Sequence, residues 1–384
     1  MPLFFQRNFH YSWQRSDKIH KLVLIAKAVT EGKRMKYVRL GSSPLEVSRV
    51  CLGSMTWGLQ NNQQDANEQL DYAQTQGINF IDTAELYAVP PSEETYGKTE
   101  TIIGHWLKAN PSRRKEIVLA SKIAGPGFSY IRDNSEISSN TIVEAVEASL
   151  KRLQTDYIDL YQLHWPNYTS PHFGNHWPNN IHYTSFNAEQ QTEKMLDILQ
   201  GLSNCIKAGK IRYIGLSNEK AWGTMRYLEE SKANNLPRMI TIQNAYSLLN
   251  RVFEGDMAEV SLRENIGLLA YSPMAFGVLS GKYIKETAAN NARLKLFPRF
   301  ARYSSEQATE ATKQYLKIAE ANNMTLAQMS LAFVTQQPFV TSNIIGATNL
   351  AQLKENIDSI NVTLSDDVLT QINEVHAVIP NPAP

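Results

Sequence analysis

The chain has 384 residues, of which 42% are hydrophobic and 20% charged, and these fractions exclude a disordered or low-complexity protein. Lys and Arg number 38 against 37 Asp and Glu, so the net charge of +1 gives no overall attraction to nucleic acid. Cys51 and Cys205 are too few for a disulfide framework, and no apolar run could cross a bilayer, so we expect a cytoplasmic protein without a membrane partner.

The first 34 residues differ in charge from the rest of the chain. They hold seven basic and two acidic residues, whereas the remaining 350 residues carry a net charge of −4. A transit peptide is one interpretation. We favour an appendage or an upstream start codon, because a hairpin-like element begins at Met35. The expected organisation is a poorly ordered basic extension over residues 1–34 and one folded domain over residues 35–384.

From residue 36 onward, short apolar strands alternate with helical patterns. Strands are expected over residues 50–53, 79–82, 117–121, 157–163, 211–216, 239–243, 267–271 and 343–345. Helices are expected over residues 65–76, 100–108, 141–153, 192–208, 221–232, 256–264, 305–322, 326–336, 350–359 and 365–376. The third of these helices begins with a predicted capping box of Thr141 and Glu144.

Eight strand–helix repeats of this kind predict a single (β/α)8 TIM barrel with an N-terminal β-hairpin. Near-continuous apolar strands are typical of a parallel sheet that helices cover on its outer face. The alternative is a doubly wound sheet, but the glycine-rich turn of a dinucleotide fingerprint is missing, since Gly53 and Gly58 have the wrong spacing. Two long segments, residues 166–190 and 273–303, are expected on the C-terminal face, where barrel active sites lie.

Four residues at the strand ends suggest a catalytic site. Asp82, Lys122 and His164 end the second, third and fourth expected strands, and Tyr87 lies five residues after Asp82. Each alone has an ordinary structural explanation, such as a turn residue or an exposed loop side chain. Because neighbouring strand ends of a barrel meet at one mouth, we expect all four side chains to share it.

The four side chains fit the reduction of a carbonyl group. The reaction needs a proton for the developing alkoxide, and a free tyrosine has a pKa of about 10. The ammonium of Lys122 is expected to depress the pKa of Tyr87, with Asp82 holding Lys122 in place. A neutral His164 would donate a hydrogen bond to the substrate oxygen.

At these positions the chain resembles the aldo-keto reductase superfamily. The matching segments are Asp82-Thr-Ala-x-x-Tyr87, Ser121-Lys122, Leu163-His164-Trp165-Pro166, Gly215-Leu-Ser-Asn218, Ile242-Gln243-Asn-Ala-Tyr246, Ala270-Tyr-Ser-Pro273 and Gln352-x-x-Glu355-Asn356. The resemblance implies reversible reduction of small aldehydes or ketones with a nicotinamide cofactor that is bound without a Rossmann domain. It also implies that Tyr87 is the proton donor, that Lys122 and Asp82 tune it, and that His164 orients the carbonyl.

The resemblance further implies a set of cofactor-binding residues. Ser217, Asn218 and Gln243 would hold the nicotinamide carboxamide, Tyr271 would stack on its ring, and Glu355 with Asn356 would meet the adenine. The remaining expected contacts are Ser272, Pro273, Met274, Gly277, Leu279, Gly281, Lys282, Arg293, Gly346, Thr348 and Gln352.

The basic segment over residues 282–302 favours NADPH as the cofactor. It contains Lys282, Lys285, Arg293, Lys295, Arg299 and Arg302 against the single acid Glu286. Such a segment suits a pyrophosphate and a 2′-phosphate, although a solvated basic surface is the alternative. The Gly346–Asn349 turn is expected to present free N–H groups to an anion. Many relatives place Lys and Arg near this turn, whereas Gly346 and Gln352 stand here.

Three further hypotheses concern two tryptophans, a histidine-containing loop and a regulatory function. Trp57 and Trp165 either line the substrate pocket or pack beneath loops. His172, His176 and His182 share one loop but lack the spacing of a metal site, so no metal is expected and a metal-assisted hydrolase is disfavoured. The main alternative to an enzyme is a nucleotide-sensing regulatory subunit on the same fold, similar to the β subunits of potassium channels, with slow turnover.

Overall fold

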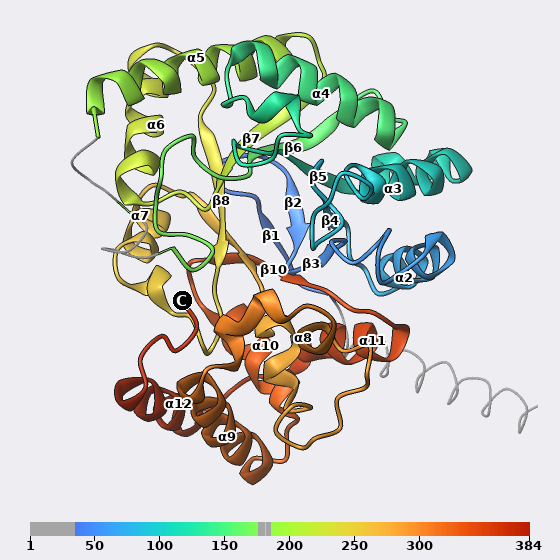
Figure 1. Ribbon diagram of the computed structural model, residues 1–384, viewed down its shortest axis with the longest axis vertical. Coiled ribbons are helices and arrows are strands. Elements are labelled where there is room, and N and C mark those ends of the chain that lie inside the picture. The colour runs from blue at the N-terminus through green and yellow to red at the C-terminus, as the bar shows by residue number, and fades with distance from the viewer. Residues whose placement is uncertain (1–34, 176–180, 182–185) are drawn as a thin grey trace, which may run out of the picture. The chain divides into compact units, whose positions relative to one another are not determined.

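The computed structural model describes residues 35–175, 181 and 186–384, so the predicted extension over residues 1–34 lies outside the described residues. Eight parallel strands close into a barrel in the order β10-β3-β4-β5-β6-β7-β8-β9 (Figure 1). They are β3 (Val50–Gly53), β4 (Phe80–Asp82), β5 (Val118–Ile123), β6 (Ile158–Leu163), β7 (Ile211–Ser217), β8 (Met239–Ala245), β9 (Gly267–Tyr271) and β10 (Val340–Ile345). The predicted (β/α)8 barrel is therefore confirmed.

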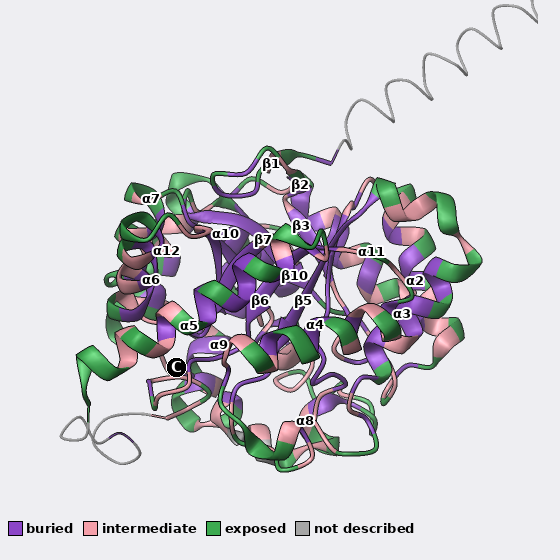
Figure 2. Cartoon of the chain, turned by 90° about the horizontal axis from the view of Figure 1, so that it is seen from above, coloured by how far each residue is buried: buried purple, intermediate pink, exposed green. Residues whose placement is uncertain are grey.

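Helices lie around the barrel, and most of the longer ones have a buried side and an exposed side (Figure 2). The helices are α2 (Gln63–Thr75), α3 (Lys98–Ala109), α4 (Ser139–Leu153), α5 (Ala188–Lys207), α6 (Ala221–Ala233), α7 (Met257–Arg263), α8 (Arg293–Leu296), α9 (Glu306–Ala321), α10 (Leu326–Gln336), α11 (Leu350–Asp358) and α12 (Asp366–Val378). Shorter 3-10 helices are η1 (Pro111–Glu116), η2 (Arg132–Asn134), η4 (Val252–Glu254), η5 (Ala275–Ser280), η6 (Pro298–Ser304) and η7 (Ser359–Asn361). In the parts of the chain that these elements cover, no helix is both long and apolar enough to span a membrane.

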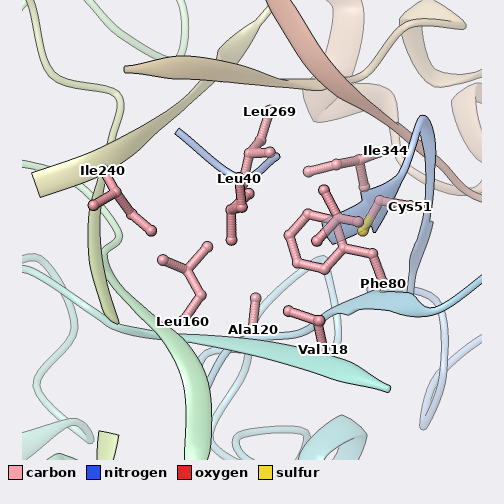
Figure 3. Packing of buried hydrophobic residues seen from close by; sticks show 10 residues of the cluster. Leu40, Cys51, Phe80, Val118, Ala120, Leu160, Ile240, Leu269 and Ile344 are labelled. Atoms are coloured by element: carbon pink, nitrogen blue, oxygen red, sulfur yellow. The ribbon is translucent and has the colours of Figure 1, made fainter. Parts of the chain in front are cut away.

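The N-terminal end of the barrel is closed by apolar side chains. The predicted hairpin is present, with β1 (Tyr37–Arg39) antiparallel to β2 (Glu46–Ser48). Leu40 follows β1 and packs, fully buried, among residues near the starts of the barrel strands (Figure 3). These include Phe80, Leu160 and Leu269. Burial of this many apolar side chains leaves the opposite end of the barrel as the place for polar groups.

The start of α4 corrects the predicted capping box. Ser138 is the N-cap residue, and its hydroxyl accepts the Thr141 backbone N–H at 3.3 Å. The Thr141 hydroxyl in turn accepts the Ser138 N–H at 2.8 Å. The predicted box of Thr141 and Glu144 is thus wrong, because a serine three residues earlier already satisfies the free N–H groups.

The two long segments lie at the C-terminal ends of the strands, as predicted. Residues after β9 are not structureless, because η5, α8 and η6 occupy half of the interval before α9. Of the segment after β6, the structure describes residues 164–175, 181 and 186–187, up to the start of α5 at Ala188. Both segments contribute to the pocket described next.

Candidate active site

Asp82, Lys122 and Tyr87 meet at the C-terminal ends of β4 and β5. Lys122 Nζ donates to Asp82 Oδ2 at 2.7 Å and to the Thr83 carbonyl oxygen at 2.8 Å. It lies 3.3 Å from the Tyr87 hydroxyl oxygen. Lys122 is fully buried and stands inside β5 rather than after it. The barrel register therefore brings an ammonium, a carboxylate and a phenol together out of water.

His164 completes the group that the strand ends predicted. It follows β6, and its backbone N–H donates to the Ile123 carbonyl oxygen at 2.9 Å, which continues the sheet register. Its ring lies 5.7 Å from the Tyr87 ring, measured between centroids. Among the described residues its buried Nδ1 atom has no hydrogen-bond partner. A buried unpaired ring nitrogen is a group that a ligand can satisfy.

The pKa of Tyr87 is raised, in contrast to the depressed value that we predicted. Burial is the largest cause, and the negative charge of Asp82 acts in the same direction. The Lys122 ammonium lowers the Tyr87 pKa, as expected, but it does not outweigh the loss of water. The phenol therefore stays protonated at neutral pH and is held as a proton donor.

Lys122 is charged and His164 is neutral. Burial alone would lower the pKa of Lys122, but the contacts with Asp82 and Tyr87 more than compensate, so its net pKa is raised. Burial, followed by the charge of Lys122, lowers the pKa of His164 well below its usual value. The site thus contains one cation, and its imidazole is neutral.

Two glutamines and an ion pair lie around the four central residues. Of these side chains, only Gln243 was predicted from the sequence. Asp82 Oδ1 accepts from Gln243 Nε2 at 2.8 Å, and Gln243 Nε2 also lies 3.2 Å from Gln162 Oε1. Glu85, fully buried, accepts two bonds of 2.7 Å from the Arg132 guanidinium. The available signal was a glutamine inside an apolar strand and a glutamate between Asp82 and Tyr87.

A pocket of about 1440 Å³ opens above these residues. Asp82, Tyr87 and His164 line it, while Lys122 lies beneath, out of its surface. Of the expected cofactor contacts, it is lined by Ser217, Asn218, Gln243, Tyr271, Ser272, Pro273, Met274, Gly277, Lys282, Arg293, Gly346, Thr348, Gln352, Glu355 and Asn356. Leu279 and Gly281 are buried outside its lining.

The two tryptophans differ. Trp165 lines the pocket, with its indole Nε1 fixed on the Pro126 carbonyl oxygen at 3.0 Å. Trp57 is fully buried, donates from Nε1 to Gln69 Oε1 at 3.2 Å, and is absent from the pocket lining. Of the two alternatives predicted for Trp57, the structure shows a packed interior side chain and not a pocket wall, because its ring packs toward α2.

Near the four central residues, the pocket offers amide and aromatic groups. The Tyr271 hydroxyl donates to Asn218 Oδ1 at 2.7 Å, and Asn218 Nδ2 donates to the His164 carbonyl oxygen at 2.8 Å. These bonds hold the Asn218 amide. The described residues leave Gln243 Oε1 without a hydrogen bond, so it can accept one from an amide ligand.

At the far end, the turn before α11 is partly closed by its own side chains. Gln352 Oε1 accepts the Thr348 backbone N–H at 3.0 Å. The Asn349 side chain caps the Gln352 N–H, and Asn356 Nδ2 donates to the Gly346 carbonyl oxygen at 3.0 Å. The prediction that this turn presents free N–H groups is therefore wrong for Thr348. Gly346 itself borders open space.

The basic segment divides into charges that line the pocket and charges that do not. Lys285 is paired with Glu320 at 2.7 Å, and Lys295 donates to the Ala288 carbonyl oxygen at 2.6 Å. Arg293 is buried, donates to the Val89 carbonyl oxygen at 3.0 Å and lies over the Phe276 ring. The Arg299 side chain lies outside the described residues.

Lys282 fits an anionic group of a ligand. It lines the pocket, and burial lowers the pKa of its ammonium. Within residues 35–175, 181 and 186–384, no carboxylate lies within ion-pair distance of it. A partly buried cation without an anion favours binding of a phosphate.

The histidine loop shows no metal site in its described part. His172 Nδ1 lies 3.0 Å from the Ser170 hydroxyl oxygen, and burial lowers the pKa of His172 to about 4. His176 and His182 lie outside the described residues. Among the described residues, no group of three His, Cys, Asp or Glu side chains is placed to hold a metal ion.

Comparison with known proteins identifies the class to which this fold and site belong. The Aldo/keto reductase family model matches residues 49–377, which is most of the chain. The chain therefore belongs to the aldo/keto reductase family. Enzymes of this family are oxidoreductases that act on small carbonyl compounds and generally use NADH or NADPH.

Individual relatives refine this placement. Protein tas of Escherichia coli is 50% identical over 353 residues, which is 91% of this chain and 100% of that protein. This confirms a likeness to Tas that segments such as Tyr246-Ser-Leu-Leu-Asn250 predicted. The uncharacterized oxidoreductase YrpG of Bacillus subtilis is 31% identical, covering 89% of this chain and 96% of its own. A probable voltage-gated potassium channel subunit beta of Arabidopsis thaliana is 30% identical, with 89% and 96% covered.

Proposed function

We propose that the protein reduces aldehydes and ketones to alcohols with NADPH, and that Tyr87 donates the proton. The observation that carries this proposal is the buried Lys122–Asp82 pair, whose ammonium lies 3.3 Å from the Tyr87 hydroxyl oxygen on the floor of the large pocket. Membership of the aldo/keto reductase family supports the reaction class.

Each central residue has its own role in the proposed reaction. A nicotinamide cofactor, when bound, supplies the hydride. Tyr87 donates its proton to the carbonyl oxygen of the substrate, and the Lys122 ammonium stabilises the tyrosinate that remains. Asp82 fixes Lys122, and neutral His164 donates a hydrogen bond that orients the carbonyl. A tyrosine is protonated at neutral pH, so Tyr87 carries the proton before the substrate binds.

The pocket lining suggests how the cofactor is held. Gln243, with Ser217 and Asn218 beside it, would hold the carboxamide, and Tyr271 would lie against the ring. Lys282 is our choice for the 2′-phosphate, since its ammonium is partly buried and unpaired with any described carboxylate. Glu355 would meet the adenine. We also propose a cytoplasmic location, consistent with two free, buried cysteines.

Replacement of Tyr87 tests the proposal directly. Tyr87→Phe should lower kcat for a small aldehyde about 10³-fold, because the proton donor is removed while the ring remains. The affinity for NADPH, measured by the quenching of protein fluorescence, should be unchanged. Tyr37→Phe, at an exposed tyrosine of the hairpin, is the matched control and should keep full activity. A Tyr87→Phe variant as fast as the wild type would overturn the assignment.

The cofactor choice has its own test. Lys282→Met should weaken NADPH about tenfold and NADH much less, because only NADPH carries the 2′-phosphate. Lys285→Met is the control, since Lys285 is paired with Glu320 and does not line the pocket. An equal loss for both dinucleotides would move the 2′-phosphate site away from Lys282.

A second function is a nucleotide-sensing regulatory subunit on the same fold. The similarity to a probable potassium channel subunit beta of Arabidopsis thaliana favours it. This function predicts tight NADPH binding with little turnover on any aldehyde or ketone. Steady-state NADPH oxidation against a panel of small carbonyl compounds distinguishes the two, since rapid turnover contradicts the sensor.

A further inference from the structure

A second pocket, of about 600 Å³, lies beside the first. The two share a wall that includes Asn218, Tyr271 and Phe173. The second pocket is built mainly from the segment after β6, the starts of α5, α6 and α7, and the residues that follow β8. Its volume is in the range of small-molecule binding sites, and nothing in the proposed reaction uses it.

The mouth of the second pocket is rich in aromatic side chains that are open to solvent. Phe186 and Trp222, both more than a third exposed, line it together with Tyr168. The Tyr168 ring meets each of them edge-on, at centroid distances of 6.1 Å and 5.8 Å. Val252 lines the same pocket and is also exposed. A cluster of exposed apolar side chains around a hollow is typical of a binding site for a flat apolar group.

Lys220 adds a positive charge to this pocket. Its side chain lines the pocket, and burial lowers the pKa of its ammonium. Asp256, which lines the same pocket, and Glu219 favour the charged form. Throughout the described part of the chain, no carboxylate lies within ion-pair distance of Lys220. A partly desolvated ammonium of this kind is stabilised by an anion from outside the chain.

Asn244 supplies an independent polar feature. It lines the pocket and is 7% exposed. Its Nδ2 donates to the Glu219 carbonyl oxygen at 3.0 Å, but its buried Oδ1 has no partner among the described residues. Buried acceptors are almost always satisfied, so this atom indicates a hydrogen-bond donor on a ligand.

We propose that the second pocket binds a small aromatic carboxylate that also carries an N–H or O–H donor. The ring would lie among Tyr168, Phe186 and Trp222, the carboxylate would pair with Lys220, and the donor would reach Asn244. The contacts come from the segment after β6, the start of α6 and the end of β8, so together they define a ligand of limited size and fixed charge.

Calorimetric titration with indole-3-acetate and indole-3-acetamide tests this site. The two probes share a ring and an N–H donor and differ in charge. The carboxylate should bind about tenfold more tightly than the amide, and Lys220→Met should remove that difference. Lys232→Met, near the other end of α6, should preserve it. Trp222→Ala, at an exposed position, should weaken both probes.

Two results would overturn the proposal. One is equal binding of carboxylate and amide, or no binding, to the wild-type protein. The other is a carboxylate preference that survives Lys220→Met, which would place the anion elsewhere. These titrations require no turnover, so they succeed or fail independently of the proposed reduction.

A kinetic measurement distinguishes whether the ligand is part of the carbonyl substrate or a separate molecule. If indole-3-acetate competes with a small aldehyde, the second pocket takes the distal end of an extended carbonyl substrate. If the KM for the aldehyde is unchanged at saturating indole-3-acetate, the pocket takes a separate molecule. Competition that survives Lys220→Met places indole-3-acetate in the first pocket and overturns the proposal. Only this measurement rests on the proposed reductase function.

Discussion

The two ends of the barrel bury their side chains equally well but with opposite chemistry. At the N-terminal end, Leu40 packs among apolar residues that include Phe80 (Figure 3). At the C-terminal end, Lys122 and Asp82 are buried to the same degree as an ion pair. Strand β4 joins the ends within three residues, since it begins at Phe80 and finishes at Asp82.

The difference separates stability from chemistry. Apolar burial at the closed end contributes stability in proportion to the area removed from water. The buried ion pair at the open end gains much less, because removing both charges from water nearly cancels their attraction. The ion pair instead holds an ammonium next to the Tyr87 hydroxyl. Substitutions at the two ends should therefore have different signatures in unfolding and in kinetics.

The largest effect is expected from breaking the ion pair. Lys122→Met should lower the free energy of unfolding by about 3–5 kcal/mol, because Asp82 is left buried without a counter-ion. Activity should also fall. The double variant Lys122→Met with Asp82→Asn should recover most of the stability but none of the activity. Urea unfolding and steady-state kinetics measure both, and a double variant no more stable than the single one would contradict this account.

A cavity at the closed end should lower stability without lowering activity. Leu40→Ala should cost about 3 kcal/mol of unfolding free energy, because the fully buried side chain leaves a void among packed neighbours. The kcat of the folded protein should be unchanged. Leu262→Ala, at a leucine that is 54% exposed on α7, is the control and should cost little. A large fall in kcat for Leu40→Ala would show that the two ends are coupled.

Most of the fold could be predicted because its strands are continuous apolar runs. The bounds predicted for β9 and α10 are those observed. Strand β10 was predicted only over its last three residues, whereas it begins at Val340. Thr341 and Ser342 concealed its first half, since polar residues are usually exposed. Here the Ser342 hydroxyl is buried and donates to the Ser48 carbonyl oxygen at 2.8 Å.

The positions of the four central residues could also be predicted, but their environment could not. Strand ends of a barrel converge by geometry, so Asp82, Lys122 and His164 had to share one mouth. The direction of the Tyr87 pKa shift depends on how much water the surrounding loops remove, and sequence does not report this. The role of Arg293 stays a prediction, since its guanidinium donates to the Val89 carbonyl oxygen while the residue also lines the pocket.

The smallest effect is expected from Glu219, another buried carboxyl group at the open end. Burial raises its pKa to about 7, against the opposing hydrogen bond from the Tyr168 hydroxyl. The folded protein then holds this proton more tightly than the unfolded chain, so stability falls as pH rises from about 4.5 to about 7. The loss is at most roughly 3 kcal/mol.

Glu219→Gln should remove this pH dependence. The variant should therefore be more stable than wild type at pH 8 but not at pH 4.5. Because the Leu40 side chain is apolar and carries no proton, Leu40→Ala should lose the same free energy at both pH values in urea unfolding. A Glu219→Gln variant that follows the pH dependence of the wild type would show that this carboxyl ionises without cost.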